Sequence, residues 1–209
     1  MANFTFNGGF RPVGTVDGTP MPATVIREVA NNYATALFQG DILIPVSDGT
    51  VAQGAAANNG LLAFVAVGFT YVVDNKRQAK KYVPANTTFS PTTVGSINAT
   101  WVECMPITPN LLMEVDGNAA APTPTVAGVI GLIGENCDLA TTTGDTVYGQ
   151  STMTLDLSTH ATTAANFRVF GLSQYPEGRL LQNDVTASRV KFLVTCNEGF
   201  WPPYTTTGA

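Results

Sequence analysis

The feature that most constrains the fold is a pattern of strand, turn and strand between residues 38 and 71. Its first part alternates Ile42, Ile44 and Val46 on one face and stops at a turn whose Gly49 can adopt a positive φ. Residues 61–71 then form a run that is apolar on both faces, as in a strand packed between layers or closed into a barrel. Gly68, inside this run, predicts a bulge or a bend.

Further strands are predicted along the chain, about eight in all, spaced like those of a sandwich or a barrel. They cover residues 101–107, 111–115, 126–134, 151–156, 167–172 and 189–195. Pro106 must lie at an edge or a strand end because it has no backbone N–H to donate. Lys191 is expected to point outward, to tolerate replacement by Ser, and to alternate with buried Val190 and Phe192.

Composition agrees with an all-β fold. Only 12% of the 209 residues are charged, and small polar residues, Gly and Pro are abundant. A helix over residues 23–36 is disfavoured by Asn31, Asn32 and the β-branched residues there. We therefore expect a single β-barrel or β-sandwich domain over residues 23–197, with an extended N-terminal arm over 1–22 and a short C-terminal tail over 198–209.

The charge balance argues against nucleic acid as a direct partner. The chain has 15 acidic and 10 basic residues, a net charge of −5, which phosphate backbones would repel. One basic cluster, residues 76–81, could contact an acidic protein surface, but a solvated hairpin is the favoured interpretation. The sequence shows no signal peptide and no run long enough to span a membrane, so we expect a soluble protein made in the cytoplasm.

The residues that most often carry chemistry are few and scattered. Cys104, Cys137 and Cys196 lie in or beside apolar stretches and are expected to be inert core thiols. The single His160 is expected in a polar turn, without neighbours at metal-ligand or triad spacing. We expect no catalytic residue, no cofactor and no metal, and hence no enzyme.

Both ends of the chain are rich in aromatic residues. An N-terminal arm with three aromatics is expected either to dock on a partner or to fold back on its own barrel, and the sequence leaves both open. The candidate interface residues of the two ends are Phe4, Phe6, Phe10, Arg11, Phe200, Trp201 and Tyr204.

The order of several short motifs carries a family resemblance. They are residues 33–41, the turn at 49–51, residues 66–69 and 82–85, the pair of strands in 101–117, residues 142–144 and 155–159, the strand 167–172 and the closing segment 183–197. In this order they resemble a family of tailed-bacteriophage virion proteins, the capsid decoration or cement proteins. The resemblance implies a structural protein of the virion that binds the outer surface of the capsid and stabilises it. The implied partners are the major capsid protein and further copies of the chain, with a homotrimer favoured over a dimer.

A second function stays open beside this one. Flat aromatic side chains can stack on sugars, and Trp101, Trp201, Tyr204 and Tyr71 suggest a carbohydrate-binding β module of a virion. Aromatic residues in strands more often belong to the core, so this function ranks second.

Overall fold

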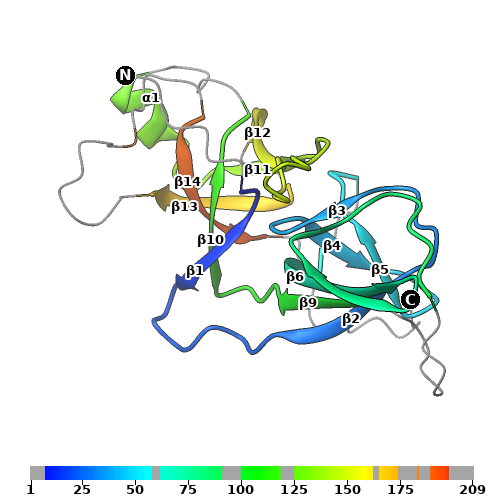
Figure 1. The fold of residues 1–209 in the computed structure, drawn as a ribbon. Coiled ribbons are helices and arrows are strands. Elements are labelled where there is room, and N and C mark those ends of the chain that lie inside the picture. Colours follow the sequence, from blue (N-terminus) through cyan, green and yellow to red (C-terminus); the bar gives the residue numbers. More distant parts are fainter. Residues whose placement is uncertain are drawn as a thin grey trace.

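Most of the strands are divided between two sheets that lie side by side (Figure 1). The computed structural model describes residues 8–57, 62–90, 100–118, 125–161, 165–173, 183 and 189–197. The chain is 51% strand and 4% helix, which confirms the all-β class.

The first sheet closes into a barrel. In the described residues its order is β4-β5-β2-β9-β6-β7, and β4 also pairs with β6, so that five strands form a closed ring and β7 extends beyond it. All of these pairs are antiparallel except β2 with β5. The strands are β2 (Val25–Val29), β4 (Ile42–Pro45), β5 (Thr50–Gln53), β6 (Phe64–Val73), β7 (Lys76–Lys80) and β9 (Thr100–Pro106).

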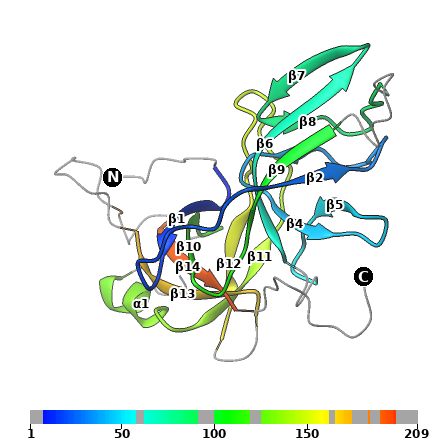
Figure 2. The ribbon, with the colours of Figure 1, turned by 90° about the horizontal axis from the view of Figure 1, so that it is seen from below.

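Strand β6 bends where the sequence predicts it. The register with β9 shifts between Ala66 and Gly68, as a bulge requires. Beyond the bulge the strand continues into a hairpin with β7 through Asp74 and Asn75, which both have positive φ. Figure 2 shows this hairpin projecting away from the second sheet. Pro106 ends β9, which confirms its predicted place at a strand end.

The second sheet has the order β1-β10-β14-β13-β11-β12 in the described residues. It curls back on itself, because Gly117, directly after β10, forms a parallel bridge with Leu155 of β12. The strands are β1 (Arg11–Thr15), β10 (Leu111–Asp116), β11 (Asn136–Ala140), β12 (Thr154–Ala161), β13 (Phe167–Leu172) and β14 (Lys191–Cys196). A small third sheet pairs β3 (Leu37–Phe38) with β8 (Tyr82–Val83).

The two sheets share an apolar layer. Phe64 and Ala66 of β6 belong to the barrel core, whereas Val65 between them belongs to the core of the second sheet. Ile42 and Leu62 join Val65 in that second core, so the outer face of the barrel at β4 and β6 is covered by the second sheet. The sequence patterns predict nine core residues, which are Ile42, Ile44, Leu62, Phe64, Val65, Val67, Val169, Phe192 and Val194. All are buried except Ile44 and Val67, which are half-buried.

One predicted strand is a helix instead. Residues 126–134 do not cross a barrel; α1 (Val126–Gly131) begins after Thr125, whose Oγ1 accepts a hydrogen bond from the Gly128 N–H at 3.1 Å. This cap satisfies a backbone donor at the start of the helix, and the helix buries Val129. The apolar run alone could not distinguish the two structures, because a short apolar segment fits a buried strand and a buried helix equally well.

His160 also differs from the prediction. It lies in β12, not in a polar turn, because β12 continues to Ala161 and pairs there with Asn136 of β11. Residues 25–29, in the segment where a helix was disfavoured, form β2.

Candidate interaction site

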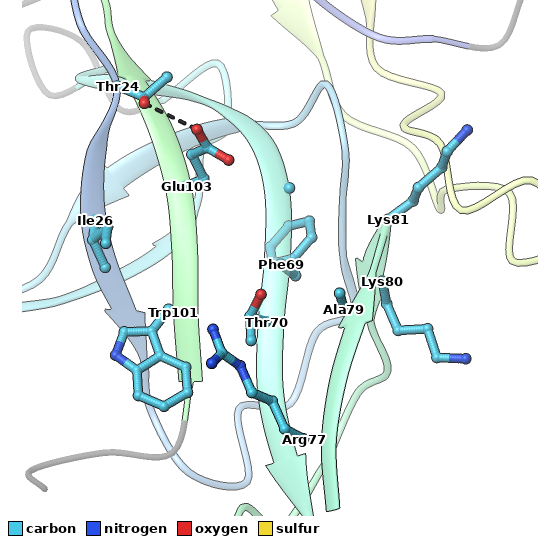
Figure 3. A pocket seen from close by; sticks show the side chains of 11 residues that line it. Thr24, Ile26, Phe69, Thr70, Arg77, Ala79, Lys80, Lys81, Trp101 and Glu103 are labelled. Carbon is cyan, nitrogen blue, oxygen red and sulfur yellow. Dashed lines mark hydrogen bonds between the residues drawn. The ribbon is translucent and has the colours of Figure 1, made fainter.

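A groove of about 920 Å³ lies on the outer face of the barrel. Strands β2, β9, β6 and β7 form it (Figure 3), and the bulge in β6 places Gly68 among its lining residues. Gly68 has no side chain, and a Cβ added there would meet no atom within 4 Å. The bulge and the glycine together keep this part of the groove open.

An arginine and a tryptophan meet in the groove. The guanidinium carbon of Arg77 lies 5.4 Å from the centroid of the Trp101 ring, which is a cation–π geometry. Figure 3 shows the Arg77 side chain reaching between Trp101 and Thr70, whereas the side chains of Lys80 and Lys81 extend away from it. Arg77 forms no hydrogen bond or ion pair with the part of the chain that the structure describes.

A carboxylate, that of Glu103, lies two residues after Trp101 on β9. Glu103 is exposed, and its Oε1 accepts a hydrogen bond from the Thr24 hydroxyl at 3.0 Å. Cross-strand pairing places Glu103 between Ile26 of β2 and Gly68 of β6, and Ile26 is 62% exposed. Because side chains alternate along a strand, Trp101 and Glu103 share the outer face of β9.

Most of the basic cluster at residues 76–81 lies in a strand and not in the turn of the hairpin. Residues 76–80 form the edge strand β7, and the turn of the hairpin comes before them. Charged side chains on an edge strand protect it from pairing with other chains, which accounts for most of the cluster. Arg77, Lys80 and Lys81 all line the groove, and of these three Arg77 is the one whose side chain points into it (Figure 3).

The predicted interface residues at the N-terminus divide into two groups. Phe10 is 1% exposed and stacks on Phe167 with ring centroids 4.6 Å apart, so it belongs to the core of this chain and not to an exposed arm. Arg11 begins strand β1, and its guanidinium forms an ion pair with Glu114 at 2.8 Å while remaining about half exposed. The predicted arm over residues 1–22 is thus corrected for Phe10 and residues 11–15, which pack on or pair with the second sheet.

The remaining predicted interface residues, Phe4, Phe6, Phe200, Trp201 and Tyr204, lie outside the described residues. Among the aromatics that suggested sugar binding, Tyr71 is a core residue. It is 5% exposed and packs on Phe89 with centroids 6.0 Å apart, so it offers no platform to a sugar.

The three cysteines are free and buried, as predicted. Burial raises the pKa of the Cys104 and Cys137 thiols to about 12, so neither ionises readily to a nucleophilic thiolate. His160 forms an exposed pair with Glu135, with 2.7 Å between Nδ1 and Oε2. Within the described ranges, no three His, Cys, Asp or Glu side chains gather as a metal site would require.

A buried carboxylate lies where the barrel meets the second sheet. Asp41 is 1% exposed; its Oδ2 accepts hydrogen bonds from the Phe38 N–H at 2.9 Å and the Gln53 amide at 3.2 Å. Removal from water raises its pKa to about 6, although bonds from Ser151, Phe38 and Gln53 oppose the shift. The backbone N–H of Ser151 also bonds the Gln39 carbonyl, so this point ties the loop before β12 to the barrel.

The prediction for Lys191 is wrong. Its side chain is buried, and Nζ donates to Asp116 Oδ1, the residue opposite it on β10. Burial raises the pKa of Asp116, and the charge and hydrogen bond of Lys191 oppose this shift. Sequence alternation placed Lys191 on a solvent face, but Val190 and Phe192 beside it are also buried, so this part of the chain is covered on both faces.

Three residues of the groove stand out in the sequence, but the sequence does not predict that they line one groove. Trp101 was noted as a flat aromatic, Arg77 as part of a basic cluster and Gly68 as a bend. The available signal was the alternation of Trp101 and Glu103 on β9; the meeting of Trp101 with Arg77 depends on the register of strands that are distant in sequence.

No protein-family model, curated protein or solved structure matches the chain. In the described part of the chain, no helix has the length and apolar character needed to span a membrane.

Proposed function

We propose that the chain is a structural protein of a phage virion that binds the outer surface of the capsid and stabilises it. The order of motifs that resembles the decoration and cement proteins suggests this function, and the all-β fold is compatible with it. The major capsid protein and further copies of the chain, as a trimer, are the proposed partners.

The observation that supports the proposal best is an outward apolar stripe at α1. Val126, Ile130 and Ile133 are 60%, 51% and 43% exposed, and their spacing places them on one side of the helix and the turn after it. Val129 and Leu132, on the other side, are buried against the second sheet. A soluble chain gains nothing from exposing three large aliphatic side chains together, whereas an interface with another protein would bury them.

The stripe lies at the far side of the second sheet from the barrel hairpin (Figure 2). The turn after α1 is fixed to β13, because the Gly134 N–H donates to the Val169 carbonyl at 2.8 Å. The stripe is therefore held by the sheet, and a partner would meet it without first ordering it.

The experiment adds purified protein to empty shells of the cognate major capsid protein and measures co-sedimentation, with the solution mass determined in parallel. Ile130→Asp with Ile133→Asp should abolish shell binding or trimer formation, since two buried charges oppose either contact. Val147→Asp, at a residue 83% exposed in a turn, is the matched control and should change neither. Unchanged shell binding and mass for the double variant would contradict the role of the stripe, and failure of the parent to bind shells would contradict the function.

The second candidate function is a carbohydrate-binding module of a virion. The observation that favours it is the groove with Trp101 and Arg77. Retention on a polysaccharide column, lost when Trp101 is replaced, would support it.

A further inference from the structure

The groove combines three features on one face of the barrel. It holds a cation fixed by an aromatic ring, a carboxylate two residues along the strand from that ring, and an open section at a glycine. The hydroxyls of Thr70 and Thr24 also line it, with the exposed aliphatic side chain of Ile26. Such a mixture of apolar surface and a few convergent polar groups is typical of sites for small ligands.

The cation is arranged to receive an anion. The Arg77 guanidinium lies over the Trp101 ring, and a guanidinium can form two parallel hydrogen bonds to a carboxylate. Arg77 has no such partner among the described residues, although the chain as a whole carries a net charge of −5. The positive charge of this hairpin is thus a local exception, and it favours an anionic occupant.

The carboxylate of Glu103 restricts which kind of anionic ligand the groove can bind. The side chains of an acidic peptide offer carboxylates to Arg77 but no hydrogen-bond donor to Glu103, and a second carboxylate placed there is repelled. A sugar instead brings hydroxyl groups, which can donate to Glu103 and bond to the two threonines. The C–H surface of a sugar ring also suits the Trp101 and Ile26 side chains.

We infer that this groove binds an acidic saccharide, a chain of uronic-acid type whose carboxylate is held by Arg77 while its hydroxyls bond to Glu103 and the threonines. The inference deepens the second candidate function and does not depend on capsid attachment. The groove and the α1 stripe lie on different sheets, so one copy could hold the saccharide and a protein partner together.

The test measures binding of three probes to the full chain by calorimetry: an oligogalacturonate, a neutral malto-oligosaccharide of equal length, and an oligo-aspartate of equal length. The oligogalacturonate should bind, and the other two should bind at least about tenfold more weakly, which corresponds to about 1.4 kcal/mol. Arg77→Gln should weaken oligogalacturonate binding by at least about tenfold. Arg77→Lys should recover only part of the loss, because an ammonium lacks the planar fork.

Two further variants separate the groove from general charge. Gly68→Leu should block binding by filling the open section, with the thermal unfolding midpoint of each variant showing that the fold survives. Lys76→Gln removes the same charge from the same strand at a residue that does not line the groove, and should leave binding unchanged.

Absence of oligogalacturonate binding, equal binding of the oligo-aspartate, or full binding by Gly68→Leu would each overturn the inference. Shell co-sedimentation of the Arg77 variants should stay at the parent level, since the α1 stripe is untouched. A failure of saccharide binding and a failure of capsid binding are therefore read from separate measurements.

Discussion

The barrel and the second sheet close in different ways, and their interiors differ accordingly. The barrel closes through a continuous backbone ladder, with β4 paired to both β5 and β6, and the buried polar side chains in its described strands are Thr50 and Thr100. In the second sheet, the edge strand β12 meets the end of β10 at an isolated backbone bridge between Leu155 and Gly117. Most of the buried polar side chains in the described residues lie in the strands of the second sheet or within three residues of them; these are Asp116, Ser151, Thr154, Asn166, Ser173 and Lys191.

Side chains in and beside this sheet satisfy backbone groups that the continuous ladder satisfies in the barrel. The Asn166 carbonyl oxygen accepts from the Leu139 N–H at 3.0 Å, and its amide group donates to the Ala56 carbonyl at 3.3 Å. Asn118, directly after the bridge, donates to Asp156 at 2.9 Å and accepts from the Leu157 N–H at 3.2 Å. A sheet that lacks a full closing ladder must satisfy its remaining backbone groups with side chains.

If this comparison is right, the barrel should be most sensitive to lost volume. Phe64→Ala should lower the free energy of unfolding by about 3–5 kcal/mol, because it leaves a cavity among the buried apolar side chains of the barrel core. Chemical denaturation with a constant m-value would measure the loss. A midpoint equal to that of the parent would show that Phe64 does not support the barrel.

The second sheet should be more sensitive to lost charge pairing. Lys191→Ser should cost about 3 kcal/mol, because it leaves Asp116 buried without its counter-ion. Combining Lys191→Met with Asp116→Leu should recover most of that loss, since an apolar pair carries no desolvation penalty. Equal destabilisation by the single and double changes would mean that packing, and not charge, is what Lys191 supplies.

The outcomes at Gly68 and Lys191 show which structural features the sequence could predict and which it could not. Alternation and turn residues were enough for the strands, including β13 at residues 167–172 and the bend at Gly68, because these signals are local. Lys191 was misplaced because its partner is 75 residues away, and α1 because an apolar run carries no sign of the packing around it. The groove could not be predicted for the same reason: Arg77 and Trp101 meet only after β7, β6 and β9 are paired in register.

The junction between the two regions should respond to pH. The pKa of Asp41 is raised from 3.8 to about 6, so the folded state holds the proton more tightly than the unfolded chain does. This contribution to stability is fully present below pH 3.8 and is lost as the pH rises through about 6. Between pH 4 and 7 the loss should be about 2 kcal/mol, because one pKa unit corresponds to about 1.4 kcal/mol.

The matched variant for this prediction is Asp41→Asn, which has no proton to release. Denaturation midpoints at several pH values should show a smaller dependence on pH for Asp41→Asn than for the parent. Asp116 titrates in both proteins and cancels in the difference. Parallel pH curves for the two proteins would place the sensitive group elsewhere.

The smallest expected effect compares one glycine in each region. At Gly117, a Cβ would lie 2.6 Å from Leu157 Cδ1 and 3.3 Å from the Phe192 ring, at the point where the second sheet closes. Gly117→Ala should therefore cost about 1–2 kcal/mol by overpacking, since both neighbours are buried and have little room to move.

At Gly68 a Cβ would point into open space, and the φ of Gly68 is not positive. Gly68→Ala should stay within about 0.5 kcal/mol of the parent or gain slightly, because alanine loses less backbone entropy on folding. Thermal unfolding of both variants under one buffer condition measures the difference. A loss at Gly68 equal to that at Gly117 would mean that the bulge in β6, like the bridge in the second sheet, depends on a glycine, and the contrast between an open barrel face and a tightly closed sheet would be withdrawn.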